Sequence, residues 1–111
     1  MELTEHSFAA KLTVEGVAMP PVPAGVARTI LSILVSGGGA DEFNPDYFSA
    51  ELTRDGTDFE FTSPLAVIRD HGQRSGAAHI GILEPGDVLT LFASAPDKIT
   101  AFVNYHDRVV S

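Results

Sequence analysis

The chain has 111 residues and a mass of 11.8 kDa, which is the size of one ordinary domain and excludes a two-domain enzyme. Its 44% hydrophobic and 20% charged residues supply a core and exclude an intrinsically disordered protein. The net charge of -8 repels phosphate backbones and anionic lipids, so we expect no binding to nucleic acid or membranes. The lack of cysteine excludes disulfides, thiolate zinc sites and a cysteine nucleophile.

The N-terminal segment shows no sign of an export signal. Residues Met1 to Gly16 contain Glu2, Glu5 and Lys11 and lack the apolar run that a signal peptide requires. The longest apolar run, Ile30 to Val35, has the length of a strand and is far shorter than the ~20 residues of a membrane-spanning helix. We therefore expect a soluble protein.

The first half of the chain predicts four strands separated by proline and glycine clusters, because its apolar residues recur at every second position. The first is Phe8 to Val14, with imperfect alternation. The second, Val26 to Ser36, is apolar on both faces, which fits a central strand or one covered by a partner subunit. Tyr47 to Arg54 and Thr57 to Thr62 are apolar on one face, and Asp55-Gly56 between them predicts a two-residue hairpin turn.

The second half repeats this pattern. Ala77 to Leu83 and Val88 to Ser94 flank Glu84-Pro85-Gly86-Asp87, in which proline and glycine suit the two central positions of a type II turn. A last strand is expected from Ile99 to Val109. About eight strands at this spacing predict one all-β domain over residues 1–111, an antiparallel β-sandwich of jelly-roll or immunoglobulin-like type.

The histidines offer little for metal binding. The nearest two are eight residues apart, so neither an HxH nor an HExxH spacing occurs, and a zinc site would have to be assembled from separate strands. We expect hydrogen-bonded or solvated side chains, and for His79, inside an apolar strand, a buried or interface position. The four histidines are His6, His71, His79 and His106.

No other motif predicts a catalytic or cofactor-binding residue. The turn Glu84 to Val88 is similar to one in cupin barrels, but Asp70 to Gly76 has one histidine where cupins need two separated by one residue. Ser36-Gly37-Gly38-Gly39 lacks both the frame of a nucleophile elbow and the lysine of a phosphate-binding loop. We interpret two acidic pairs as solvent-facing: Asp41-Glu42 and Asp58/Glu60.

Two strands carry more apolar surface than a small sandwich covers easily. Ile30 to Val35 and Ala77 to Leu83 are apolar on both faces. This pattern indicates that another copy or another protein covers one face, and a homo-oligomer is expected. The alternative is that the chain's own terminal segments cover it.

The run from Ala24 to Val110, about four-fifths of the chain, resembles small virion proteins of tailed bacteriophages. The likeness rests on AGVARTILSILVS (24–36), an acidic and glycine-rich loop, FSAELTRDGTDFEF (48–61) and GILEPGDVLTLFASAPDKITAFVNYHDRV (81–109). Within the last segment, Leu83 to Asp87, Ala93-Ser94-Ala95 and Ile99 to Tyr105 match the pattern of that class.

The resemblance implies a structural, non-enzymatic protein of the virion: a capsid decoration (cement) protein or a related head or tail accessory protein. Its partners would be the major capsid protein or other virion subunits. Residues 1–8 are a candidate arm that reaches a neighbouring subunit. Two alternatives stay open. One is a carbohydrate- or ligand-binding module of a phage tail or bacterial protein, although no Trp and two Tyr leave few rings for sugar stacking. The other is a metal-dependent small β-barrel enzyme.

Overall fold

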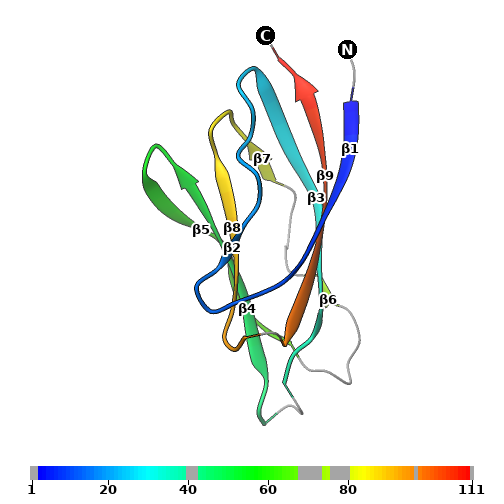
Figure 1. Cartoon of the computed structure of the whole chain (residues 1–111), viewed down its shortest axis with the longest axis vertical. Helices are drawn as coiled ribbons and strands as arrows, with labels where there is room; N and C mark the ends of the chain where they lie inside the picture. The colour runs from blue at the N-terminus through cyan, green and yellow to red at the C-terminus, as the bar shows by residue number, and fades with distance from the viewer. Residues whose placement is uncertain (1–2, 40–42, 68–73, 76–80, 97, 111) are drawn as a thin grey trace.

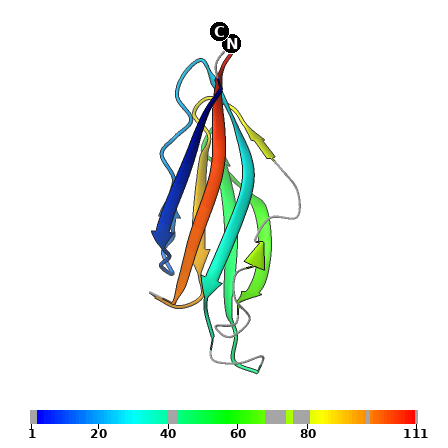
Figure 2. The same ribbon diagram turned by 90° about the vertical axis from the view of Figure 1, so that its right-hand side faces the viewer.

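The computed structural model describes residues 3–39, 43–67, 74–75, 81–96 and 98–110. These residues form two facing antiparallel sheets, so the predicted all-β sandwich is confirmed (Figure 1). The molecule measures 49 × 27 × 20 Å, and both ends of the chain lie at the same end of the long axis (Figures 1 and 2). Among the described residues there is no helix long and apolar enough to cross a membrane.

The strands alternate between the two sheets along most of the chain. One sheet, sheet A, has the order β1-β9-β3-β6, with β7 also paired to β3; the other, sheet B, has the order β2-β8-β4-β5. The strands are β1 (Leu3–Lys11), β2 (Val17–Ala18), β3 (Val26–Gly37), β4 (Asp46–Arg54), β5 (Thr57–Val67), β6 (Arg74–Ser75), β7 (Gly81–Leu83), β8 (Val88–Ala93) and β9 (Ile99–Val109).

This connectivity is that of a jelly roll. In immunoglobulin domains the first two strands share a sheet, whereas β1 and β2 lie in opposite sheets here. Because β9 occupies one side of β3, the short strands β6 and β7 both lie along its other side. Each sheet is therefore four positions wide, in agreement with the predicted number of about eight strands.

Both predicted turns are present. Asp55 and Gly56 have φ angles of 52° and 78°, as a two-residue hairpin between β4 and β5 requires. In the turn from β7 to β8, Gly86 has a φ of 88° and the Asp87 N–H donates to the Glu84 carbonyl oxygen at 3.0 Å. The first turn joins two paired strands of sheet B, whereas the second leads from β7 in sheet A to β8 in sheet B, and these two strands do not pair.

The central strand β3 departs from the predicted alternation. A β-bulge shifts its register against β9 between Ile30 and Ser32. As a result Ile30 lies on the same buried face as Ile33 and Val35, and Leu31 is exposed. The strand itself spans the predicted residues, but only its inner face is fully covered by the chain.

The N-terminal strand corrects the predicted arm. Residues 3–8 are not a free segment, because they begin β1, which pairs without interruption with β9 from Leu3↔Arg108 to Lys11↔Thr100. The predicted strand at Phe8 to Val14 therefore begins and ends earlier. Backbone hydrogen bonds to β9 bind this segment within its own sheet.

The core lies between the sheets and takes residues from outside the predicted strands. Met19 and Val22, from the proline-rich segment before β3, are almost completely buried. Backbone hydrogen bonds from Met19 to Leu89 and from Val22 to Asp87 tie the proline-rich segment to the start of β8. Of the predicted strand at Ala77 to Leu83, residues 81–83 form β7, and residues 77–80 lie outside the described residues.

Candidate functional site

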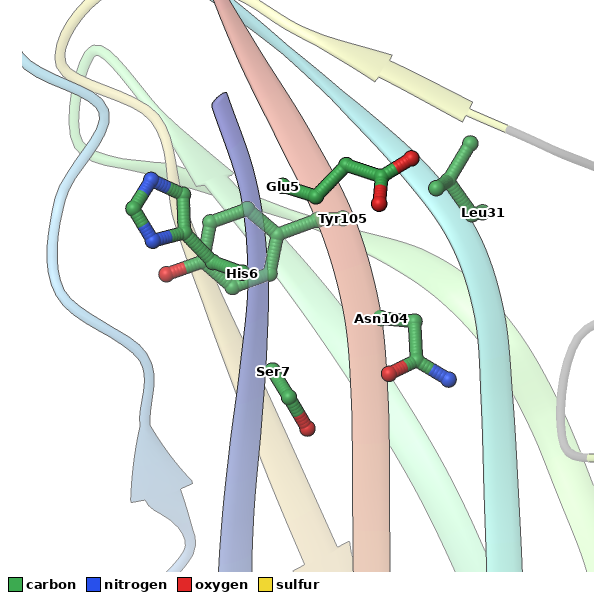
Figure 3. A pocket seen from close by; sticks show the side chains of 6 residues that line it. All are labelled: Glu5, His6, Ser7, Leu31, Asn104 and Tyr105. Atoms are coloured by element: carbon green, nitrogen blue, oxygen red, sulfur yellow. The ribbon is translucent and has the colours of Figure 1, made fainter. Parts of the chain in front are cut away.

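A hollow on the described surface lies on sheet A, where β1, β9 and β3 run side by side (Figure 3). It is an open depression of about 340 Å³. Its lining residues are Glu5, His6, Ser7, Leu31, Asn104 and Tyr105. The bulge in β3 contributes Leu31, so an irregularity of the fold shapes this surface.

Side chains reach the two sides of sheet A alternately at this hollow. Since neighbouring residues of a strand point to opposite faces, Glu5, Ser7 and Asn104 lie on the outer face and His6 and Tyr105 on the inner face. Asn104 donates from Nδ2 to Ser32 Oγ at 3.0 Å. The hollow therefore presents a carboxylate, a hydroxyl and an amide to solvent.

Behind the hollow, charged and aromatic groups form a continuous stack. The rings of His6 and Tyr105 have their centroids 5.2 Å apart at an angle of 27°. The guanidinium Cζ of Arg28 lies 4.5 Å from the centre of the Tyr105 ring, a cation–π arrangement. Arg28 also pairs with Asp107 at 2.8 Å. This stack lies on the inner side of sheet A, toward the end at which β1 begins and β9 ends.

A second ion pair holds the β7–β8 turn against β4. Arg54 donates from Nη2 to Asp87 Oδ2 at 2.7 Å, and the Glu84 N–H donates to the same oxygen at 2.7 Å. The hydrogen bond from Arg54 lowers the pKa of Asp87, against the opposing effect of burial. The same bond raises the pKa of Arg54. Both groups serve to hold the turn in place.

The structure does not bring the described histidines together. His6 is opposite Tyr105 and belongs to the inner face, whereas His106 is opposite Glu5 and belongs to the outer face. Within the described residues, no three His, Asp or Glu side chains gather in a group that would hold a metal ion. His71, His79 and the Asp41-Glu42 pair lie outside those residues.

The glycine-rich loop and the acidic pair Asp58/Glu60 show no arrangement for binding a ligand in the described structure. The N–H groups of Gly38 and Gly39 donate to the carbonyl oxygens of Lys98 and Val67, so neither is free to hold a phosphate. Asp58 accepts a hydrogen bond from the Thr53 hydroxyl at 2.6 Å on an exposed surface.

Sequence reasoning missed Arg28, although a signal was present. Arg28 lies two residues before the buried Ile30 in an apolar strand, so it occupies a core position. A charged side chain at such a position requires a partner, which the structure identifies as Asp107.

Comparisons with known proteins identify the fold and no family. No protein-family model matches the chain, and no curated protein matches it. The nucleoplasmin-like N-terminal domain of Drosophila FKBP39 is similar over 98% of this chain and 93% of its own, with a TM-score of 0.55 and 11% identity. A Bacillus endospore appendage protein, from a family of disulfide-linked pili, is similar over 99% and 88%, with a TM-score of 0.58 and 11% identity.

A third similar structure is the xylan-binding CBM22-1 domain of Paenibacillus barcinonensis Xyn10C, with a TM-score of 0.43, 14% identity and coverage of 95% of this chain and 71% of that domain. The first two structures show that the chain shares a small β-sandwich fold. This agrees with the β-sandwich predicted from the strand pattern. No family model ties the chain to bacteriophages.

Proposed function

We propose that this protein is a structural subunit of a tailed bacteriophage virion, most simply a capsid decoration protein that binds and stabilises the head shell. It acts by association and not by turnover. The observation that carries this proposal concerns the buried charged residues of the described chain. Each of them forms an ion pair that holds the sandwich together.

Arg28 and Asp87 are the buried charged residues of the described chain. Arg28 is bound by Asp107 and the Pro20 carbonyl oxygen, and Asp87 by Arg54 and the Glu84 N–H. Both pairs join separate segments of the sandwich, as structural ion pairs do. A scaffold with these pairings is suited to present surfaces to other subunits.

The two outer faces of the sandwich differ in a way that suits a decoration protein. Sheet B carries Glu51, Asp58 and Glu60 near each other on β4 and β5. Sheet A carries the cross-strand row Ala9–Phe102–Leu34, defined by neighbouring positions on β1, β9 and β3. We infer that this apolar row faces the shell and that the acidic face remains in solvent.

The assembly is non-covalent. The similar Bacillus appendage proteins form disulfide-linked pili, whereas this chain contains no cysteine. Stability on the shell would have to come from buried surface and backbone pairing.

The test is co-sedimentation of the purified protein with empty capsid shells of the phage that encodes it. We expect saturable binding at a fixed ratio to the major capsid protein. Phe102→Asp, in the apolar row, should weaken binding, whereas Glu60→Lys on the opposite sheet should not. Thermal melting of each variant establishes that it is folded. Protein that stays in the supernatant with every shell preparation contradicts the proposal.

A ligand-binding module is the second candidate, favoured by the polar hollow in Figure 3. In that case Asn104→Ala would abolish binding of a soluble oligosaccharide in a glycan-array assay, and shells would not retain the protein. The two readouts separate the candidates.

A further inference from the structure

The four sheet edges of the described sandwich differ sharply in their capacity to pair with another strand. In sheet B, β2 has only two residues, and β5 contains Pro64, Asp58, Glu60 and two register shifts. Opposite β1 in sheet A, the edge is made of the two- and three-residue strands β6 and β7. Short strands, proline, bulges and charges are the means by which proteins block edges.

The edge formed by β1 lacks most of these features. Its nine residues pair with β9 in one unbroken register, and they include no proline. Figure 2 shows β1 at the margin of its sheet, beside β9. Glu5, Ser7, Ala9 and Lys11 are exposed. Among the described residues, β1 therefore offers the long, regular edge of the molecule.

Hydrogen bonding identifies which backbone groups point outward. The Leu12 N–H donates to the Ile99 carbonyl oxygen at 2.9 Å, directly beyond β1. Because inward and outward backbone groups alternate along an antiparallel strand, even-numbered residues of β1 bond to β9 and odd-numbered residues face the open edge. A second strand can bond only to those odd-numbered residues.

A second copy of the chain can meet this requirement through its own β1. When two β1 strands pair antiparallel about a twofold axis perpendicular to the sheet, the residue numbers of every facing pair add up to the same sum. Odd-numbered residues face odd-numbered residues only when that sum is even. One such register centres on Phe8 and places Glu5 opposite Lys11 of the other copy, twice by symmetry. Sliding one strand by two residues in one direction places Glu5 opposite Ala9. Sliding it by two residues in the other direction places Lys11 opposite Ser7.

We propose that two copies of this protein pair through β1 in the register Glu5–Lys11, joining their A sheets into one continuous sheet. This inference rests on the proposed function as a structural subunit and names its self-association site. The pairing adds about eight backbone hydrogen bonds, two for each of four facing odd-numbered pairs. It also brings the two Phe8 side chains together at the axis on the inner face, where each already packs on the core.

The first test reverses charges and measures mass by light scattering and sedimentation over a range of concentrations. We expect the wild type to form a dimer. Lys11→Glu places like charges opposite each other twice, so the dissociation constant should rise at least about tenfold. The double variant Glu5→Lys/Lys11→Glu should restore wild-type dimerisation. Lys98→Glu, an exposed change of equal charge in the β8–β9 loop, is the matched control and should leave the dimer intact.

The second test examines the register. The native chain has no cysteine, so engineered thiols react only with each other. A mixture of Ser7→Cys and Ala9→Cys proteins should form a disulfide-linked heterodimer faster than either protein alone forms a homodimer. Facing residues lie about 5.5 Å apart, within reach of a disulfide, while the diagonal distance is about 7–8 Å.

A wild type that is monomeric at all concentrations overturns the inference, and so does a dimer that tolerates Lys11→Glu or shows no preference for the Ser7–Ala9 crosslink. These outcomes are independent of shell binding. If the protein binds shells as a monomer, only the proposed β1 pairing is refuted. If it forms the β1-paired dimer but does not bind shells, only the proposed function is refuted.

Discussion

Arg28 and Asp107 face each other across β3 and β9, with Nε 2.8 Å from Oδ1 and Nη2 3.2 Å from Oδ2. The Arg28 side chain is only 4% exposed, and that of Asp107 is 17% exposed. Nη1 of Arg28 also donates to the Pro20 carbonyl oxygen at 2.7 Å. One guanidinium therefore joins sheet A to the proline-rich segment that covers the end of the core.

Replacing Arg28 with methionine should destabilise the protein by about 3 kcal/mol, measured as the free energy of unfolding in urea. The change keeps most of the apolar stem but leaves the Asp107 carboxylate without its partner, which is the costly way to break such a pair. Arg108→Met, on the next exposed position of β9, should cost less than about 0.5 kcal/mol.

The double variant Arg28→Met/Asp107→Leu should recover much of the loss, because no charge then remains unpaired in the partly buried site. If Arg28→Met and Arg108→Met destabilise the protein equally, the ion pair between Arg28 and Asp107 adds no stability, and each variant shows only the effect of removing one positive charge.

Truncating two phenylalanines to alanine should have very different effects. Phe48 on β4 is fully buried and Phe59 on β5 is 51% exposed. We expect Phe48→Ala to cost about 3–5 kcal/mol in urea unfolding, since it removes apolar contacts and leaves a cavity, and Phe59→Ala to cost less than about 1 kcal/mol. Similar losses for both would contradict the placement of the core beside β4.

Features set by neighbouring residues were predictable from the sequence. The Asp55-Gly56 and Glu84–Asp87 turns depend on residues that accept the required φ angles, and β9 spans the predicted Ile99–Val109 because its alternation is regular. In both cases the chemistry that decides the structure lies within a few positions along the chain.

Features that depend on distant segments were not predictable. The bulge in β3 arises from pairing with β9, and a single extra residue moves Leu31 outward. Met19 is buried where its segment hydrogen bonds to Leu89 on β8, far along the chain. The candidate hollow has the same origin, since its residues come from β1, β3 and β9, which no local pattern places side by side.

Two glycines with positive φ should respond differently to alanine. Gly56, at the tip of the β4–β5 hairpin, has a φ of 78° and open space where a Cβ would lie, so Gly56→Ala should cost only about 1–2 kcal/mol of backbone strain. At Gly37, with a φ of 87°, a Cβ would collide with the Lys98 carbonyl oxygen as well. Gly37→Ala should therefore lower the unfolding free energy and melting temperature clearly more, and an equal effect would contradict the close approach of β3 to Lys98.

The ion pair between Arg54 and Asp87 should make stability depend on acid pH. The hydrogen bond from Arg54 lowers the pKa of Asp87 in the folded protein below its ordinary value near 3.8. A carboxyl whose folded-state pKa is lowered stabilises the fold fully above its unfolded pKa, and this contribution disappears as the pH falls through the lower folded value. We expect the difference in unfolding free energy between wild type and Asp87→Asn to be constant from pH 7 to 5 and to shrink below about pH 4.

Urea unfolding at a series of pH values measures this difference directly. Glu15→Gln removes one exposed carboxylate elsewhere and controls for net charge. Since the Glu84 N–H donates to the same Asp87 oxygen as Arg54, asparagine retains an acceptor for the turn, and the pH-dependent part reports the charge of the pair. A difference that stays unchanged down to pH 2 would mean that Asp87 holds the turn without its charge.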